Sequence, residues 1–480
     1  MDQITYWNDA AQEANRVTHT TEDPREAGAR GPAGSSRAFA IVHLAMHDAY
    51  FSIRPTAEHE TYLTAPPPLP PLPPSLPRPS ARAAIAAAAH ATLSALYPAQ
   101  KAYFDAHHAA AGLSEPGMRD GHVHGLKIAA AILAARKNDP VTGDDGHASS
   151  VMRGAHRPDP ETPTQGYHAP FYGARSQCFA VMQRHQLDAP PALDSPAHIA
   201  ALAEVRAKGI APELMGTLPA GAVPRTPAET VIGLFWAYDG AKGLGTPPRL
   251  YNQIIRKIAV AQKNTLAKNA RLFALVNAAM GDAGILAWEQ KYLHDLWRPV
   301  VGIREHDPSM GPSGVGNDAF DSECDPDWLP LGAPKTNEHG VKNGTPPFPA
   351  YPSGHATFGA AAFQTVRHFY EDTAIGSDDL ADGIPFVSEE LNGISTDNKG
   401  NVRPRHTRKF PRGLWQMIEE NGTSRVYLGV HWVYDAFARD PDTGDMDLSQ
   451  NIGGVPLGLA IANDLATNGL KQANGAGPSA

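Results

Sequence analysis

The sequence predicts an all-α protein in which two helical bundles pack together in one compact domain. Alanine- and leucine-rich stretches recur along the chain without the alternation of apolar and polar residues that strands show. With 480 residues, 42% of them hydrophobic, the chain can bury a large core. The helices expected from these stretches cover, in order, residues 37–51, 81–97, 117–137, 228–238, 251–262, 266–297, 356–370 and 412–433.

Composition places the expected boundaries along the chain. We expect an N-terminal helical part over residues 1–64 and a proline-rich connector over 65–80, where the run PPPLPPLPPSLPRP is too stiff for a helix. A helical bundle should follow over 81–265, and a second bundle over 266–470 should carry the functional residues. The last residues, 471–480, are small and polar and are expected to be disordered.

Charge and hydropathy narrow the class of protein. The net charge of −9 gives no support for nucleic-acid binding. No run of 18 apolar residues is evident, so we expect no membrane span. The N-terminus lacks the basic and apolar stretches of a secretion signal, which makes the cytoplasm the default expectation and unconventional export the alternative. Cys178 and Cys324 fit free thiols better than a disulfide framework.

The first of three segments rich in chemistry is KYLHDLWRP, ending at Pro299. Lys291 and Arg298 are seven positions apart, so on a helix they would differ by only about 20° of rotation. Pro299 then discourages continuation of the helix. Trp288 lies one turn before Lys291, within a stretch typical of a buried helix. Alone, such a cation pair usually marks a solvated helix face. Whether this pair binds a ligand therefore depends on the other two segments.

The second segment, FPAYPSGH, begins at Phe348 and ends where an alanine-rich helix is expected to start. A Pro-Ser-Gly turn at a helix start offers the Ser353 hydroxyl and unpaired backbone N–H groups to an anion. His355 follows directly and can exchange protons with that anion. The alternative is a capped helix with an incidental histidine.

The third segment, SRVYLGVHWVYD, contains a second histidine. His431 and Asp435 are four positions apart, so on one helical face the carboxylate can orient the imidazole and strengthen it as a ligand. Arg425 stands roughly 120° away around an ideal helix. It must therefore reach around, or the helix must distort near Gly429.

Taken together, K-x6-RP, PSGH and SR-x5-H-x3-D resemble the signature shared by vanadium-dependent haloperoxidases and the type 2 phosphatidic acid phosphatase superfamily. Further stretches resemble the fungal vanadium chloroperoxidases, among them PPFPAYPSGHATFG, SEELNG, AYDG-x6-PPRLYNQ, IGGVPLG and SRAFAIVHLAMHDAYFSI. The similarity covers most of the chain and fades in residues 65–165 and 302–343.

The resemblance implies a role for each matching residue. His431 would bond the vanadium of a bound vanadate, while His355 would take a proton from hydrogen peroxide. Trp288 and Phe348 match positions on the halide side, and Asp239 matches a carboxylate that pairs with a vanadate-binding arginine. The groups that would contact the vanadate oxygens are Lys291, Arg298, Ser353, the Gly354 amide and Arg425. The residues that would act in catalysis are His355, Lys291 and His431.

The resemblance also implies an activity. A vanadate-dependent haloperoxidase uses hydrogen peroxide to oxidise chloride or bromide to hypohalous acid, which halogenates an organic acceptor. Three fixed cations would lower the negative charge on the oxygens and make them electrophilic. Vanadate and phosphate have nearly the same shape, so phosphate is expected in the same site when vanadium is absent. The alternative is a soluble acid phosphatase in which His431 forms a phosphohistidine and His355 protonates the leaving group.

The histidine spacing of the third segment recurs near the N-terminus, at Arg37, His43 and His47. No PSGH or K-x6-RP accompanies this copy, which is either a remnant of duplication or a coincidence. We expect both histidines to be hydrogen-bonded within a buried helix and not to bind a metal.

Overall fold

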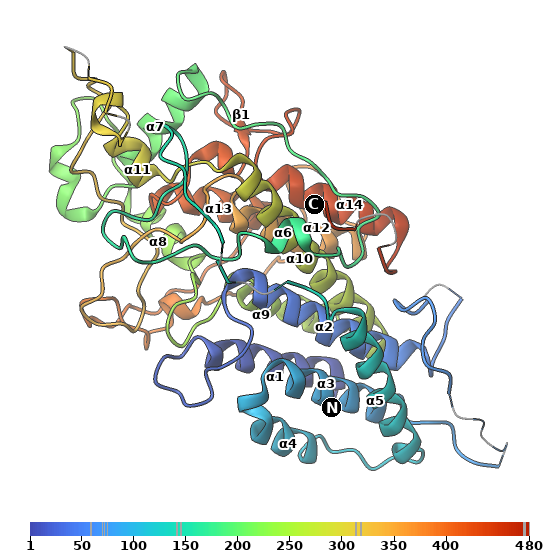
Figure 1. Cartoon of the computed structure of the whole chain (residues 1–480). Coiled ribbons are helices and arrows are strands. Elements are labelled where there is room, and N and C mark those ends of the chain that lie inside the picture. The colour runs from blue at the N-terminus through green and yellow to red at the C-terminus, as the bar shows by residue number, and fades with distance from the viewer. Residues whose placement is uncertain are drawn as a thin grey trace.

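Helices form almost all of the regular structure, which confirms the all-α prediction. The computed structural model describes residues 1–57, 60–69, 71, 73, 75–140, 143–144, 146–312, 314–316, 319–473 and 477–479. Within these ranges the strands are two residues long each, β1 (Ala438–Arg439) and β2 (Met446–Asp447), and they pair antiparallel. The helices divide into two bundles, blue to teal and orange to red in Figure 1, with α9 and α10 between them.

The N-terminal bundle owes its close packing to small residues. It contains α1 (Gln3–Thr18), α2 (Gly31–Phe51), α3 (Ala81–Leu96), α4 (Lys101–Ala109) and α5 (Met118–Ala135). The Ser80 hydroxyl caps α3 by accepting a hydrogen bond from the Ala83 amide. Along the contact of α3 with α5, a Cβ on Gly125 would lie 2.2 Å from the Ala84 carbonyl oxygen. Glycine therefore allows the two backbones to approach.

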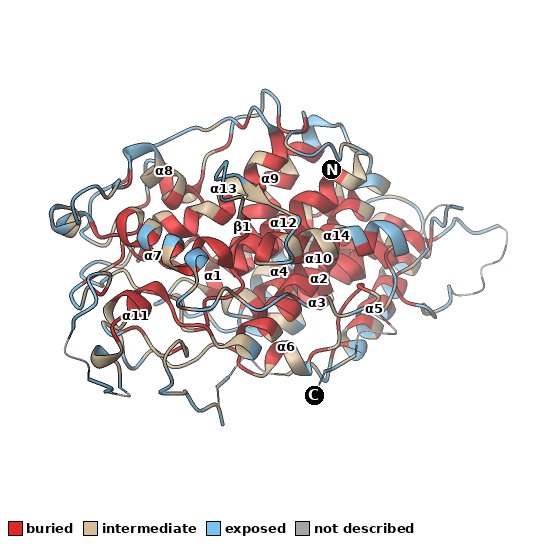
Figure 2. Cartoon of the chain, turned by 90° about the horizontal axis from the view of Figure 1, so that it is seen from above, coloured by how far each residue is buried: buried red, intermediate tan, exposed pale blue. Residues whose placement is uncertain are grey.

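The central helix is α10 (Leu266–His294), which packs against both α2 and α12 (Gly354–Phe369). Its burial is visible in Figure 2, where the middle of the molecule is red. By length and composition α10 could cross a membrane, and 89% of its most apolar 18-residue window is buried inside the protein. Polar residues such as Asn277 and Asp282 interrupt the helix, so it contains no uninterrupted run of 18 apolar residues. The window is apolar because other helices cover it.

The C-terminal bundle surrounds α12. Its other long helices are α13 (Gly413–Tyr427) and α14 (Gly454–Asn468), and a Cβ on Gly454 would lie only 2.5 Å from the Ser353 carbonyl oxygen. The remaining helices are α6 (Tyr172–Arg175), α7 (Pro196–Lys208), α8 (Pro227–Phe235), α9 (Pro247–Ala261) and α11 (Pro299–Arg304), with short 3-10 turns η1 (Pro98–Gln100), η2 (Pro212–Thr217), η3 (Pro308–Met310), η4 (Glu389–Leu391) and η5 (Val433–Asp435).

All eight expected helices form, and three of them, α8, α10 and α13, end three or more residues earlier than predicted. The helix expected over 266–297 ends at His294 because Asp295 adopts a left-handed conformation, with φ 45°. The helix expected over 412–433 ends at Tyr427, and Gly429 turns the chain with φ 73°. Four helices longer than eight residues were not anticipated, namely α1, α4, α7 and α14.

Several smaller expectations can be compared with the structure. Within the connector, the described residues of 65–80 form no helix, and 70, 72 and 74 lie outside the described residues. Part of the tail expected to be disordered is hydrogen-bonded: Gln177 donates to the Ala473 carbonyl at 2.7 Å and Arg184 to the Gly477 carbonyl at 3.1 Å. Cys178 and Cys324 are free and buried, as predicted. The bundle boundaries stay a prediction.

The N-terminal echo of the third segment forms no anion pocket. Arg37 pairs with Asp139 at 2.6 Å. His43 lies 2.7 Å from the Phe39 carbonyl oxygen, and His47 lies 2.8 Å from Asp48. Both histidines are thus hydrogen-bonded within buried α2, as expected.

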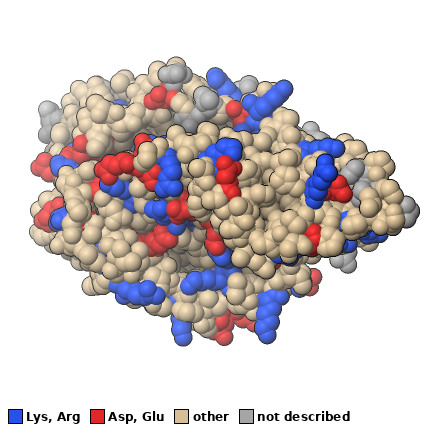
Figure 3. Space-filling model, turned by 90° about the horizontal axis from the view of Figure 1, so that it is seen from below, with Lys and Arg blue, Asp and Glu red and all other residues tan. Residues whose placement is uncertain are grey.

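On the face shown in Figure 3, cationic and anionic side chains are interspersed and form no basic stripe.

Candidate active site

Residues of the second and third segments line one cavity of about 340 Å³, whereas Lys291, Arg298 and Ser353 are buried behind it and are not among its lining residues. Lys291 lies in the last turn of α10, Arg298 precedes α11, and Arg425 lies in the last turn of α13. The PSGH turn begins α12, so its first amides face the same region. The predicted site residues that line this cavity are Asp239, Trp288, Phe348, Gly354, His355, Arg425 and His431.

Lys291 and Arg298 were predicted to share one helical face, but they lie on different elements. The left-handed residue Asp295 ends α10, and Arg298 has an extended backbone, so the two cations do not share a helical face. Both side chains instead reach the carbonyl oxygens that precede α12. The Lys291 ammonium donates to those of Pro349, Ala350 and Pro352 at 2.9, 3.1 and 2.5 Å, and Arg298 Nε donates to that of Phe348 at 2.9 Å.

The Ser353 turn is built as an anion site requires. The Ser353 hydroxyl accepts a hydrogen bond from the Ala356 amide at 3.4 Å, and the Ser353 amide donates to the Asp435 carbonyl at 2.7 Å. In the described part of the chain, the Gly354 and His355 amides of the first helical turn have no acceptor. Such free amides at a helix N-terminus bind anions well.

Arg425 is fixed by a carboxylate from another part of the chain. Asp239 accepts hydrogen bonds from the two terminal nitrogens of Arg425, Nη2 at 2.6 Å and Nη1 at 3.1 Å. Arg425 is fully buried, and its Nε has no hydrogen-bond partner among the described residues. Because α13 ends two residues later, Arg425 and His431 are not on one helix. The distortion near Gly429 was one of the two predicted solutions.

His431 is oriented by Asp435, although the two residues do not share a helical face. Asp435 lies in the 3-10 turn η5, and its Oδ2 is 2.7 Å from His431 Nδ1. Because Arg298 Nη1 donates to Nε2, Nε2 keeps its lone pair and Nδ1 carries the hydrogen that Asp435 accepts. Burial, with Arg298 and Lys291 nearby, holds the pKa of His431 well below its ordinary value, so the imidazole is neutral.

His355 has the geometry of a base. Its Nε2 donates to the Ala237 carbonyl oxygen at 2.6 Å, which leaves Nδ1 free to accept a proton. Burial and the Arg425 charge lower the pKa of His355 to about 3. The side chain is therefore neutral over the ordinary pH range. An anion bound nearby would favour its protonated form.

The pocket has three cationic side chains and only two carboxylates beside them. Burial lowers the pKa of Lys291 well below its ordinary value and that of Arg298 to about 9. Asp239 and Asp435 are the two predicted carboxylates beside these three cations. Burial also raises the pKa of Asp435 to about 7, which weakens its contribution. Buried cations of this kind favour the entry of an anion.

Two buried arginine nitrogens have no hydrogen-bond acceptor among the described residues, and the oxygens of an oxyanion would supply one. Arg298 Nη2 and Arg425 Nε are buried without a partner in the described part of the protein. No group of three or more His, Cys, Asp or Glu side chains within the described ranges could hold a bare metal ion. The donor set therefore suits a metal that arrives as an oxyanion, with one nitrogen available at His431.

One contact must change for such a ligand to bind His431. Arg298 Nη1 donates to His431 Nε2 at 2.9 Å and to the Val430 carbonyl at 2.7 Å. The lone pair of Nε2 cannot serve Arg298 and a metal at once. A ligand at Nε2 therefore requires Nη1 to move aside, towards the oxygens of that ligand.

An aromatic wall closes one side of the cavity. The rings of Trp288 and Phe348 are 4.9 Å apart, and the Lys291 ammonium lies 5.7 and 5.1 Å from their centroids. His168 packs against the same wall, 5.9 and 6.1 Å from these two rings. Sequence reasoning missed His168, because it lies in an irregular segment and belongs to no motif.

Comparisons with known proteins agree with this architecture. The family model described as the vanadium chloroperoxidase N-terminal domain matches residues 1–114, and the one described as the VCPO second helical-bundle domain matches 271–440. Vanadium chloroperoxidase from Curvularia inaequalis is 36% identical over 98% of this chain and 90% of its own length.

Solved structures share the fold at lower identity. A bacterial vanadium-dependent iodoperoxidase is 17% identical with a TM-score of 0.60, and the match covers 97% of this chain and 96% of that one. The holo form of a bacterial vanadium-dependent chloroperoxidase is 15% identical with a TM-score of 0.61, over 94% of this chain and 95% of its own.

Proposed function

This chain belongs to the vanadium chloroperoxidase family, and we propose that the pocket at the start of α12 binds vanadate for a haloperoxidase reaction. The enzyme uses hydrogen peroxide to oxidise a halide to hypohalous acid, which then halogenates an organic acceptor. In each turnover hydrogen peroxide, halide and one proton give hypohalous acid and water. The observation that carries this assignment is the set of three buried cations around His431, in a chain similar to a vanadium chloroperoxidase over nearly its whole length.

The chain offers a donor for each side of the anion. His431 would hold the metal through Nε2, with Asp435 fixing the ring. The unpaired nitrogens of Arg298 and Arg425 would donate to oxygens. The remaining donors would be the Ser353 hydroxyl, the Gly354 amide and the Lys291 ammonium, which would have to release one of its three carbonyl acceptors. Phosphate has the same shape and charge type, and it would occupy the same donors when vanadate is absent.

The residues around the anion supply acid–base chemistry and charge. Vanadate, when bound, supplies a Lewis-acidic centre that activates hydrogen peroxide towards halide. His355 Nδ1 would take the proton that hydrogen peroxide loses, while the Ala237 carbonyl holds the ring through Nε2. Lys291 would draw negative charge from the reacting oxygen. Trp288 and Phe348 would exclude water on the halide side, which strengthens that electrostatic effect.

We propose chloride as well as bromide as the oxidised halide. Chloride is harder to oxidise and needs the more electrophilic oxygen. The cationic groups lie directly against the aromatic wall here, with the Arg298 guanidinium 4.9 Å from the Phe348 ring. An apolar wall beside fixed cations supports oxidation of the more demanding halide.

Reconstitution tests the function. The purified full chain is stripped of metal, supplied with orthovanadate or with phosphate, and assayed for peroxide-dependent halogenation. Activity should return with vanadate alone, and excess phosphate should block its return. Undiminished halogenation after complete removal of vanadium would exclude the proposal. Phosphate-ester hydrolysis without halogenation would favour the acid phosphatase alternative, in which His431 is the nucleophile.

A further inference from the structure

One short segment, Ala237 to Asp239, holds two site residues at once. The Ala237 carbonyl accepts the hydrogen bond from His355, at 2.6 Å. The Asp239 carboxylate accepts hydrogen bonds from Arg425 Nη2 at 2.6 Å and Nη1 at 3.1 Å. Any displacement of this segment therefore moves a candidate base and a candidate anion donor together.

Tyr238, between these two residues, has a conformation that a bulky residue rarely adopts. Its φ is 44°, in the left-handed region. Residues in such conformations persist only where the surrounding structure holds them, and they gather at functional sites. Tyr238 is fully buried. Its left-handed backbone must therefore be held by contacts with its neighbours.

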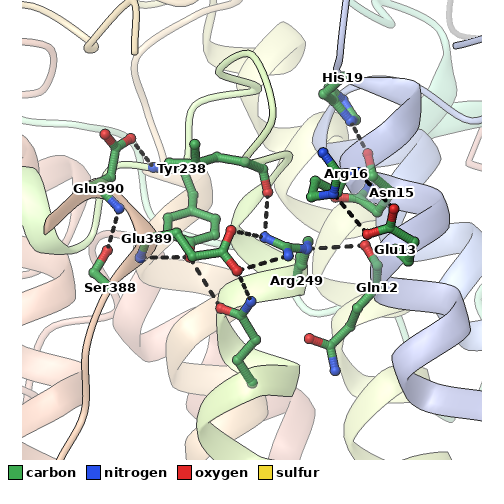
Figure 4. Close-up of polar contacts among 12 residues, drawn as sticks. Gln12, Glu13, Asn15, Arg16, His19, Tyr238, Arg249, Ser388, Glu389 and Glu390 are labelled. Atoms are coloured by element: carbon green, nitrogen blue, oxygen red, sulfur yellow. Dashed lines mark hydrogen bonds and ion pairs between the residues drawn. The ribbon is translucent and has the colours of Figure 1, made fainter. Parts of the chain in front are cut away.

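The turn that contains η4 supplies those contacts, and Figure 4 shows them. The Tyr238 amide donates to Glu390 Oε1 at 3.3 Å. The Tyr238 hydroxyl accepts from the Glu389 amide at 3.1 Å and donates to Gln253 at 3.1 Å. Tyr238 is thus held at its backbone and at the end of its ring.

This turn is itself firmly anchored. Glu390 is fully buried, and its Oε2 accepts from Arg403 at 2.6 Å and from the Thr336 hydroxyl at 2.5 Å. Glu389 pairs with both terminal nitrogens of Arg249, at 2.6 and 2.9 Å. Arg249 also donates to the Gln12 carbonyl of α1 at 3.0 Å (Figure 4). The turn is therefore tied to α1 and α9.

We propose that Glu390 is a positioning residue for the anion pocket, acting through the Tyr238 amide. By holding that amide it fixes where the Ala237 carbonyl meets His355 and where the Asp239 carboxylate meets Arg425. Small misplacements of reacting groups are costly, and about 1 Å can reduce a rate about 100-fold. The inference rests on the proposed function only for the roles of His355 and Arg425.

The decisive variant is Glu390→Gln, which keeps the size of the side chain. The glutamate accepts hydrogen bonds at both oxygens, whereas glutamine has one accepting oxygen and one NH2 group. If its oxygen faces cationic Arg403, its NH2 group confronts the Tyr238 amide, and two donors repel. Because Arg403 is charged, we expect this orientation, with loss of the hold on Tyr238.

Asp378 offers a matched control. It is also buried, pairs with Arg367 at 3.0 Å, and accepts from the Leu414 and Trp415 amides at 2.9 Å each. These amides lie at the start of α13, whereas Arg425 lies at its end. Asp378→Asn should therefore lower stability with no change in the anion pocket.

Three measurements on the full chain test the proposal. They are the thermal midpoint, the dissociation constant for inorganic phosphate of the vanadium-free protein by calorimetry, and kcat and KM for peroxide with vanadate. Glu390→Gln should weaken phosphate binding about tenfold and lower kcat/KM about tenfold, given the cost of a small misplacement. Asp378→Asn, with a similar loss in midpoint, should leave both unchanged.

A second variant covers a failure of Glu390→Gln to fold. Glu390→Asp keeps the negative charge beside Arg403 but is one methylene shorter, so it cannot also reach the Tyr238 amide. It should weaken phosphate binding in the same direction. Wild-type phosphate affinity in either folded variant, or equal losses in Glu390→Gln and Asp378→Asn, would overturn the proposal. If the wild type binds phosphate but never halogenates, the proposed function fails, and the phosphate measurements still decide the role of Glu390.

Discussion

Asp435 holds His431 through a hydrogen bond of 2.7 Å between Oδ2 and Nδ1, and it does so from a 3-10 turn. The backbone carbonyl of Asp435 also accepts the Ser353 amide at 2.7 Å. Asp435 therefore connects the histidine to the serine turn at the start of α12. Its other carboxylate oxygen, Oδ1, has no partner among the described residues.

This relationship predicts that Asp435→Asn separates vanadate from phosphate. The substitution weakens the orientation and basicity of His431, which matters for a bond to vanadium, whereas phosphate is held by the cations. Loss of such a supporting group typically costs about 10- to 100-fold in metal affinity. We expect a loss of that size for vanadate and a smaller one for phosphate, measured by titration of the vanadium-free protein. Equal losses for both anions would contradict a role through His431.

The two histidines of the pocket should fail in different ways. His431→Ala should abolish productive coordination of vanadate and leave only electrostatic attraction of the anion by the cations. His355→Ala should retain vanadate but lower the rate of peroxide use by about 100- to 10,000-fold, the usual contribution of a positioned acid–base group. Equilibrium dialysis with vanadate, beside steady-state kinetics, distinguishes the two defects. Full chlorinating turnover in His355→Ala would refute the acid–base role.

Much of the fold and the identity of the pocket residues could be predicted, because alanine-rich helices and the three motifs are local properties of the sequence. The geometry between them could not. His431 and Asp435 do meet, but through a turn and not a helical face, since α13 ends at Tyr427. Lys291 and Arg298 both reach the carbonyl oxygens before α12, because helix α10 ends at Asp295 and the chain changes direction there.

The contacts made by backbone groups were beyond sequence reasoning altogether. The Ala237 carbonyl that orients His355 belongs to a residue with no functional side chain. Its position depends on a left-handed tyrosine held by a turn about 150 positions away in the sequence. His168 likewise reaches the aromatic wall only through the tertiary fold. Asp239 was identified through resemblance and not through spacing.

A histidine outside the pocket predicts how stability depends on pH. Burial in α2 lowers the pKa of His43 from 6.5 to about 4. The unfolded chain therefore binds a proton between these values that the folded chain does not, so the contribution of His43 to stability falls as pH drops through this window. Over the whole window the loss is roughly 3 kcal/mol in the free energy of unfolding.

His43→Gln removes this titration, so the stability difference between wild type and variant should shrink as pH falls from 7 to 4. Urea unfolding of both proteins at several pH values measures it. Here the control is the wild type itself at pH 8, above both pKa values, where the residue is neutral in both states. A difference that stays constant with pH would show that His43 does not titrate in this way.

The last prediction concerns the choice of halide and rests on Phe348. Its ring lies 4.9 Å from that of Trp288 and 5.1 Å from the Lys291 ammonium, so it separates that cation from water on the halide side. Phe348→His would bring a polar ring and water to this wall, screening the charge that makes the oxygen electrophilic. Because chloride needs the stronger oxidant, chlorination should fall by about tenfold more than bromination, roughly 1.4 kcal/mol in relative barrier. Steady-state kinetics with both halides at mildly acidic pH measure the ratio, with Phe348→Leu as the apolar control that should change it least. A wild-type enzyme that oxidises bromide but never chloride would refute the choice of halide and leave the haloperoxidase function intact.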